Sequence, residues 1–533
     1  MTSPVTGVGT LVGFMLRRDK VRLPSWVAGF ALFMLYLAAA IPAAYGVEED
    51  LAGAASMFSD PVGRLIVGPG HGFDAPSLER FVTNGYGLYF MLLVALMSIL
   101  TVVRHTRLEE QAGRAELVRA SVVGPHAGLA AAMLVTLLYE VAVSLAMVPV
   151  MLVVGGFGLG GSLLFAASVG AVGLAFGGLT AVTAQLSEYS RGAAGMAGIG
   201  LGIAFVLRAG GDMVRQGGSL LSWFSPLGWG QQTAPFVLDR WWPLLLLLAF
   251  AALTTWVGFV LSIRRDVGAS LYAVRAGRPR ARPRLGTPLG LAARLQRASV
   301  IGWTASLFVS GILFGTFADL MRGAEEDLPE AFREIFGEGA FLDAYLAYMV
   351  GFMAYLVAAF AVLAMQGLRA EETRGRAEPL LATPMSRTAW LGSNLLVAAG
   401  GVLAAMVATG LGTALGVGIV TGDWSRFGQL TAAHANFVPP VWVVLGVATL
   451  LFGLAPRLVP AASALVGYAL VVGTFGPLLD LPQALFGVSP FDHPSQMPLE
   501  VFAAVPFLVL TGLAVLLALA GVLAFRRREI DGV

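Results

Sequence analysis

The sequence predicts an all-α polytopic membrane protein with about twelve transmembrane helices in two homologous halves of six. Its composition, a series of long apolar stretches and a repeated motif support this prediction. Of the 533 residues, 57% are hydrophobic and only 12% are charged, whereas about a quarter of the residues in soluble proteins are charged. The mean hydropathy of +0.79 agrees with this composition. These values exclude a soluble globular chain.

Twelve stretches are long and apolar enough to cross a bilayer, whose core of about 30 Å requires roughly 20 helical residues. In the first half they are residues 26–45, 83–103, 126–154, 163–183, 192–207 and 242–263. In the second half they are residues 300–320, 345–366, 389–420, 436–455, 460–478 and 501–525. The first stretch has full spanning length and no small-residue cleavage pattern follows it, so we expect no cleaved signal peptide.

Basic residues gather at three places that the spans predict to lie on one side of the membrane. They are Arg17, Arg18, Lys20 and Arg22, nine arginines from Arg264 to Arg297, and the run Arg526, Arg527 and Arg528. Positively charged loops stay in the cytoplasm. We therefore expect a multi-pass protein of the bacterial plasma membrane with both termini cytoplasmic.

The basic stretch in the middle of the chain divides it into predicted domains. These are a first six-span half (1–265), an Arg/Pro-rich cytoplasmic linker (266–296) and a second six-span half (297–533). Binding of anionic lipid or nucleic acid is the alternative role for the Arg-Pro run. A connector is favoured, because positive charge in this loop already follows from the orientation of the spans.

Several kinds of chemistry are excluded by the residues that the sequence lacks. There is no cysteine, so disulfides, thiolate nucleophiles and cysteine-bound metals are ruled out. Lys20, the single lysine, lies between Asp19 and Val21, so no Gly-Lys-Ser/Thr phosphate-binding loop is present. The outer-loop residues His71, Asp74, Glu79, Asp492 and His493 match no metal or hydrolytic pattern. We expect a chain that is not an enzyme and holds no cofactor of its own.

One charged motif, Glu-Glu-x-x-Gly-Arg-Ala-Glu, follows the second stretch of each half. The first copy contains Glu109, Glu110, Gly113, Arg114 and Glu116. The second, 262 residues later (109 to 371), contains Glu371, Glu372, Gly375, Arg376 and Glu378. The spacing predicts a charged cap on a short helix with an apolar ridge, which suits docking onto a soluble partner. A solvated loop is the alternative for one copy, but two copies at equivalent places favour docking.

Together with an amphipathic N-terminal segment (Leu11, Phe14 and Met15 before Arg17-Arg18), this motif resembles the permeases of ABC exporters. The twelve-span form with both motif copies is similar to actinobacterial permeases for polyketide antibiotics (tetronasin-type) and multidrug efflux. In that family the segment is a coupling helix that sits in a groove of the ATPase. The resemblance implies export of lipophilic compounds such as antibiotics or drugs, driven by two copies of a separate ATPase that binds ATP and Mg. The second copy fits the family better, because Thr383-Pro384 follows it where the first has Ser121-Val122.

Glu140 lies near the middle of the third stretch. An ionisable group at this depth is costly and by default functional, here as a site for a cationic substrate or as a proton relay. A carboxyl group packed between helices is the alternative. The relay would fit a rival function, a proton-coupled secondary drug transporter.

Two further apolar patterns each have two interpretations, as packed core or as the lining of a substrate path. Small residues spaced for close helix contact are Gly192, Gly195, Gly198 and Gly202, for which packing is favoured. Candidates to line a path between the halves are Phe90, Met91, Met97, Met349, Phe352, Met353 and Tyr355. Contact with lipid or with the core is favoured for this second group.

Overall fold

The computed structural model describes residues 3–44, 48–266, 268–271, 280–323, 341–476 and 482–529. Across these ranges every regular element is a helix and there is no strand. Twelve helices are long and apolar enough to cross a membrane, which confirms the predicted fold class. The chain divides into two compact units, unit 1 (Met1–Ala276) and unit 2 (Gly277–Val533), and each contains six of these helices.

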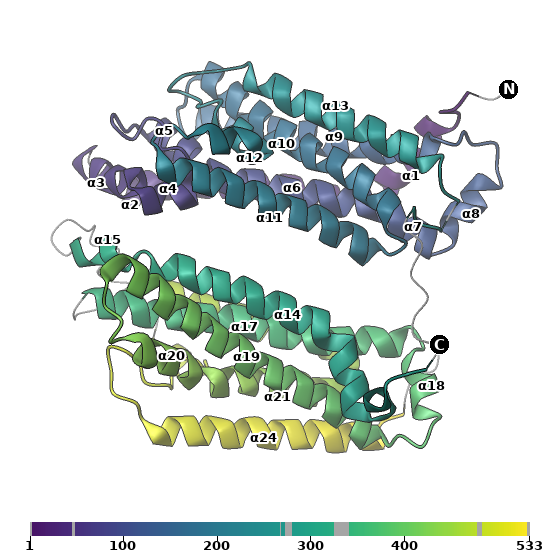
Figure 1. Ribbon diagram of the computed structural model, residues 1–533, viewed down its shortest axis with the longest axis vertical. Helices are drawn as coiled ribbons and strands as arrows, with labels where there is room; N and C mark the ends of the chain where they lie inside the picture. The colour runs from purple at the N-terminus through teal and green to yellow at the C-terminus, as the bar shows by residue number, and fades with distance from the viewer. Residues whose placement is uncertain are drawn as a thin grey trace. The chain divides into compact units, whose positions relative to one another are not determined.

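Unit 1 is a bundle of long helices that run side by side (Figure 1). Its spanning helices are α2 (Arg22–Ala44), α6 (Gly87–His105), α9 (Ala127–Val153), α10 (Leu159–Leu186), α11 (Ser190–Val214) and α13 (Pro243–Ser262). The short helices are α1 (Val8–Arg18), α3 (Glu48–Ser59), α4 (Pro61–Val67), α5 (Leu78–Arg80), η1 (Phe81–Gly85), α7 (Arg107–Gln111), α8 (Arg114–Arg119), η2 (Leu220–Phe224) and α12 (Pro226–Gln231). Because α10 packs against α6, α9, α11 and α13, it is the central helix of this unit.

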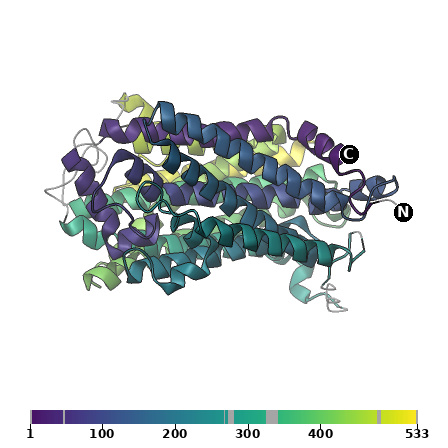
Figure 2. The same cartoon turned by 90° about the horizontal axis from the view of Figure 1, so that it is seen from above.

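Figure 2, turned by 90°, shows the purple to teal helices of unit 1 from above, where they again run side by side. Unit 2 is likewise built from six spanning helices. Its spanning helices are α14 (Pro288–Gly315), α17 (Phe341–Thr373), α19 (Arg387–Thr421), the pair α20 (Phe427–Asn436) and α21 (Val438–Leu454), α22 (Ala461–Phe475) and α24 (Ala504–Arg527). The short helices are η3 (Pro283–Gly286), α15 (Ala318–Gly323), α18 (Ala377–Leu381), η4 (Pro456–Leu458) and α23 (Gln483–Phe486). Helix α21 is central, in contact with α17, α19, α22 and α24.

Glycines bring α14 and α19 into close contact in unit 2. They are Gly311 and Gly315 on α14, and Gly412 and Gly416 on α19. A Cβ atom at any of these four positions would overlap the backbone of the facing helix. Small residues four positions apart allow this approach, and van der Waals contact then holds the two helices together.

The glycine contact predicted for the fifth span is not formed within unit 1. On α11, Gly195, Gly198 and Gly202 are exposed and have no neighbouring atom in the space that a Cβ would occupy. Packing by these three glycines within unit 1 is therefore not observed, and the packing interpretation stays a prediction. The spacing alone could not identify which of several glycine-rich helices has a partner on its small-residue face.

Helix α11 is also longer than the predicted stretch 192–207, because its charged residues are paired in the interior. Arg208 is fully buried and lies 3.5 Å from Asp212. The Nη2 group of Arg208 also donates to the carbonyl oxygen of Leu65 at 2.7 Å. The hydroxyl of Ser222 donates to Asp212 Oδ1 at 2.6 Å. Because Arg208 and Asp212 have these partners, α11 continues to Val214, beyond the end of the predicted stretch at residue 207.

Candidate functional site

The first copy of the motif begins where α6 changes direction. Thr106 leaves the helical conformation (φ −116°, ψ −87°), and α7 starts at the next residue. Gly113, with φ +71°, separates α7 from α8. Residues with a side chain rarely adopt this left-handed backbone conformation, whereas glycine does so at little cost. The first copy therefore forms two short helices, joined at Gly113, where the spacing predicts a single short helix.

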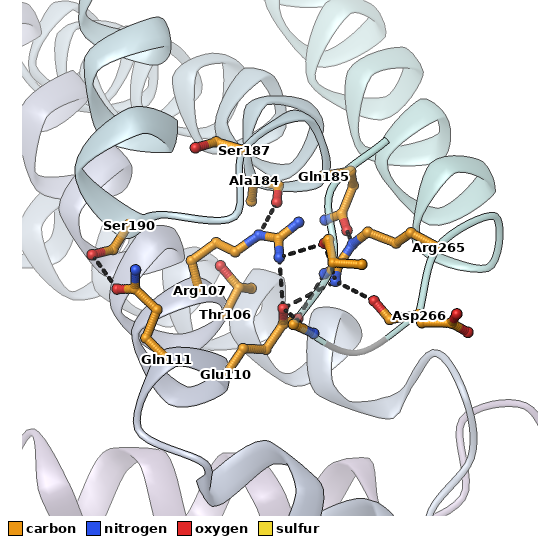
Figure 3. A network of polar contacts seen from close by, with 12 residues as sticks. Thr106, Arg107, Glu110, Gln111, Ala184, Gln185, Ser187, Ser190, Arg265 and Asp266 are labelled. Atoms are coloured by element: carbon orange, nitrogen blue, oxygen red, sulfur yellow. Dashed lines mark hydrogen bonds and ion pairs between the residues drawn. The ribbon is translucent and has the colours of Figure 1, made fainter. Parts of the chain in front are cut away.

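Glu110 points inward and connects three segments of unit 1 (Figure 3). One of its carboxylate oxygens accepts from Arg265 Nη2 at 2.6 Å, and the other accepts from Arg107 Nη1 at 2.7 Å. Arg107 is fully buried and also donates to the carbonyl oxygen of Ala184. Arg265 Nε donates to Gln185 Oε1 at 2.6 Å. Glu110 thus ties α7 to the end of α10 and to the chain that follows α13.

Glu109 connects the motif to the N-terminal helix. Its carboxylate lies 2.6 Å from Arg18 Nη1 and 2.7 Å from Arg114 Nε. Between α1, α7, α8 and the start of α9 is a cavity of about 110 Å³. Its lining includes Leu11, Phe14, Met15, Arg18, Glu109, Glu110, Arg114, Val118 and Arg265. The amphipathic segment predicted from the sequence is therefore helix α1, and its apolar side chains face the charged motif.

The second copy begins differently, because α17 continues without a break through Glu371 and Glu372. The expectation that both copies stand on separate short helices is therefore wrong for these two glutamates. Glu371 lies 3.1 Å from Arg376. Glu372 accepts two contacts from Arg528 Nη2, at 2.6 and 2.8 Å. Gly375 has φ +67° and precedes the short helix α18.

The two copies share one pattern of ion pairs. In each, the first glutamate pairs with the arginine of the motif, five residues later. The second glutamate pairs with an arginine that follows the sixth span of its own unit, Arg265 or Arg528. These arginines are 263 residues apart (265 to 528), which is within one residue of the motif repeat. We call Glu110–Arg265 and Glu372–Arg528 the tether pairs.

The predicted site residues therefore divide into inward and outward groups. Glu109, Glu110 and Glu372 face their units, whereas Gly113, Arg114, Glu116, Arg376 and Glu378 are exposed, and Glu371 and Gly375 are intermediate. The apolar ridge also differs between the copies. Leu117 is 76% exposed, whereas Leu380 and Leu381 pack against the core of unit 2. The outward groups are the ones that a partner protein can contact.

A buried polar cluster beside the first copy was not found from the sequence. Asp19, which ends α1, accepts from Arg104 Nε at 3.0 Å, His105 Nε2 at 2.7 Å and the Tyr139 hydroxyl at 2.9 Å. Burial alone would raise the pKa of Asp19, but His105, Tyr139 and Arg104 together lower it to about 2. The cluster fixes the joint between α1 and α2 to the end of α6, directly before the motif.

Glu140 is buried between three helices of unit 1. Its carboxyl group is hydrogen-bonded to the Ser98 hydroxyl on α6, and it faces Gly173 on α10, where a Cβ would overlap it. Among the described residues no cation pairs with it. This geometry supports the packing alternative more than a substrate or relay role.

We expect Glu140→Gln to reduce export of cationic and neutral substrates equally, and by less than twofold, because glutamine keeps the size of the side chain and a hydrogen bond to Ser98. The loss of stability should be about 1 kcal/mol or less. Efflux assays with one charged and one uncharged fluorescent substrate measure the ratio. A selective loss of the cation would instead assign Glu140 to substrate binding or proton relay.

Twelve apolar helices in two units, each with the same charged element after its second span, define a multi-pass membrane protein of repeated architecture. Residues 285–526 match the family described as "Multidrug efflux system permease Rv1217c, C-terminal domain". The chain is also 37% identical to the multidrug efflux system permease protein Rv1217c of Mycobacterium tuberculosis, over 99% of this chain and 96% of that protein. The chain belongs to this family of multidrug efflux permeases, which confirms the resemblance to such permeases.

Proposed function

We propose that this chain is the membrane subunit of an ATP-driven exporter of the ABC type, and that α7–α8 and the end of α17 with α18 are its two coupling elements. The observation that supports this most directly is the repeated arrangement of the motif. Each copy lies at the end of a spanning helix, exposes charged side chains and is held to its unit by a tether pair. A repeated docking surface suits a partner present in two copies.

The tether pairs suggest how movement of a partner would reach the spans. Glu110 holds α7 to the ends of α10 and α13, and Glu372 holds the end of α17 to the end of α24. Closure of an ATPase dimer would push on the exposed side chains of the coupling elements. Through the tether pairs, that push would reach several spanning helices at once, a rigid-body movement of the kind that switches transport proteins.

The remaining parts of the proposal follow from this assignment. ATP and Mg would bind to the separate ATPase, in two copies per permease, and this chain would carry out no chemical reaction itself. The protein would lie in the bacterial plasma membrane, with both termini and the coupling elements in the cytoplasm. The relative's name, a multidrug efflux permease, supports lipophilic small molecules such as antibiotics or drugs as the substrates.

The experiment that tests the proposal is affinity purification of the tagged protein in mild detergent followed by native mass spectrometry. We expect a complex of one permease with two ATPase subunits. A proton-coupled carrier would be recovered without an ATPase, and its transport would persist when ATP is depleted but the proton gradient remains. Recovery of the permease alone, under conditions that preserve a known ABC complex, would contradict the proposal.

A further inference from the structure

Unit 2 contains a second cavity, at the end of α17 that is far from the coupling element. It has a volume of about 250 Å³ and lies between α17, α22 and the chain that connects α22 to α24. Tyr348 on its wall and Glu372 in the motif are separated by 24 residues of one helix (348 to 372), or about 36 Å at 1.5 Å per residue. The cavity is therefore distinct from the coupling element.

Aromatic rings make up much of the cavity wall. They are Tyr348, Phe352, Tyr355, Phe437, Phe486 and Phe491. The rings of Tyr355 and Phe491 meet edge to face at 4.9 Å, and those of Tyr348 and Phe352 are stacked at 6.4 Å. Gly473 makes room for the Tyr355 hydroxyl, since a Cβ there would overlap it. Tyr348, Phe352 and Tyr355 are only half-buried, so their rings are accessible from the cavity.

The same wall carries one acidic side chain and no basic one. Asp492 lines the cavity. Within the described residues its carboxylate has neither a hydrogen-bond donor nor a cationic partner. Aromatic faces attract cations through their negative quadrupole, and an unpaired carboxylate adds a full charge. The cavity therefore favours a ligand that is both aromatic and positively charged.

In unit 1 the two positions that correspond to Phe352 and Asp492 are closely packed, and neither is an acid. By the motif repeat of 262 residues, Phe352 corresponds to Phe90, which is fully buried. The centre of the Phe90 ring lies 4.7 Å from that of Phe33 and 5.6 Å from that of Phe165. By the repeated Ser-Pro step (225 to 489), Asp492 corresponds to Gly228, where a Cβ would overlap the backbone of Ser222. A cavity beside these positions, lined by Met91, Phe165 and Gly230 among others, is about 10 Å³. Unit 1 folds with closely packed residues at these positions, so the repeated fold itself does not require the open, acidic cavity of unit 2.

We propose that the aromatic cavity of unit 2 binds an organic cation that carries aromatic groups, and that such cations are among the exported compounds. The binding step stands on the cavity alone, whereas its place in export rests on the proposed function. Asp492 pairs with the cationic group of the ligand, and Phe352 and Tyr355 contact its rings. Phe90, Met91 and Met97, the path candidates on the second span, are buried in unit 1 instead.

The binding step can be tested on the full-length chain purified into lipid nanodiscs, with no ATPase and no ATP present. The probe is ethidium, a planar aromatic cation whose fluorescence rises on binding, and the uncharged dye Nile red is the comparison. We expect Asp492→Asn to raise the dissociation constant for ethidium about tenfold and to leave that for Nile red unchanged. Phe352→Ala should weaken ethidium binding about three- to tenfold.

Asp74→Asn is the matched control, because Asp74 is an exposed acid like Asp492 but does not line the aromatic cavity. This variant should bind ethidium like the wild type. Wild-type affinity of Asp492→Asn for ethidium, or an equal loss for ethidium and Nile red, would overturn the proposal. Since no ATPase is present, these results are independent of the proposed ATP coupling. Failure of that coupling would appear as intact ethidium binding without ATP-dependent transport.

Discussion

Under the proposed ATP coupling, replacement of both Glu110 and Glu372 by glutamine is expected to reduce export strongly while the chain still inserts into the membrane. The side chain of Glu372 is 7% exposed and that of Glu110 is 10% exposed, and their carboxylates lie 2.6 Å from Arg528 and Arg265, respectively. Removal of one partner from a buried ion pair leaves the other charge uncompensated and typically costs about 3–5 kcal/mol. The coupling elements would then move without the ends of the spans. We expect export to fall at least tenfold, measured as initial efflux rates with the partner ATPase present.

The exposed glutamates of the same motif provide the control. Glu116→Gln and Glu378→Gln remove the same two charges from outward positions that hold no tether pair. This double variant should weaken capture of the ATPase but retain export when the ATPase is abundant.

A double-mutant cycle of Glu372→Gln with Arg528→Gln should give an interaction energy of about 1–3 kcal/mol. Wild-type export by the Glu110/Glu372 variant would disprove the tether role.

The repeat is what allowed the sequence to predict this region. A charged motif found once is compatible with a solvated loop, but two copies at equivalent places favour a docking element. In the structure Gly113 and Gly375 both have positive φ angles. Arg265 and Arg528 are separated by almost the same number of residues as the two motif copies, which is a signal that could pair them with the motif. Their place in basic runs indicates only the orientation of the spans. Which motif side chains face inward depends on packing, and no local pattern reveals it.

The fold was predicted to the level of its spans, and the errors have physical causes. Apolar length identifies a helix that crosses a membrane, but it fails where a charge is paired inside, as at Arg208 in α11. It also fails where the helix continues beyond the bilayer, as α17 does through Glu372. The break between α20 and α21 at Phe437, directly before Val438-Pro439-Pro440, falls inside an apolar region. Proline cannot donate the backbone hydrogen bond that a continuous helix would need there.

The same limit applies to the buried cluster around Asp19, for which a large stability effect is expected. Its partners Arg104, His105 and Tyr139 lie 85 to 120 residues away in sequence, so no motif connects them. Asp19→Ala leaves the buried His105 and the partly buried Arg104 without their acceptor. We expect the free energy of unfolding to fall by about 3–5 kcal/mol, seen as a lower midpoint in thermal unfolding of the purified protein.

The pH range for this test follows from the pKa of Asp19. That pKa is lowered from 3.8 to about 2, so the stability that the ionised carboxylate contributes is fully present above about pH 4 and is lost as the pH falls toward 2. Measurements between pH 6 and 8 therefore compare the variant with a fully ionised Asp19.

Unit 2 supplies a matched control for Asp19→Ala. The repeat of the basic residue before each first span (20 to 297) makes Gln296 the counterpart of Asp19, and Gln296 donates to Asn394 Oδ1 at 3.0 Å. This contact joins two neutral groups, so Gln296→Ala should cost only about 1 kcal/mol. If the two variants lose the same stability, the charges of the Asp19 cluster are not what hold α1 and α2 to the end of α6. A larger loss for Asp19→Ala would mean that unit 1 uses charges at a position where unit 2 has the neutral contact between Gln296 and Asn394.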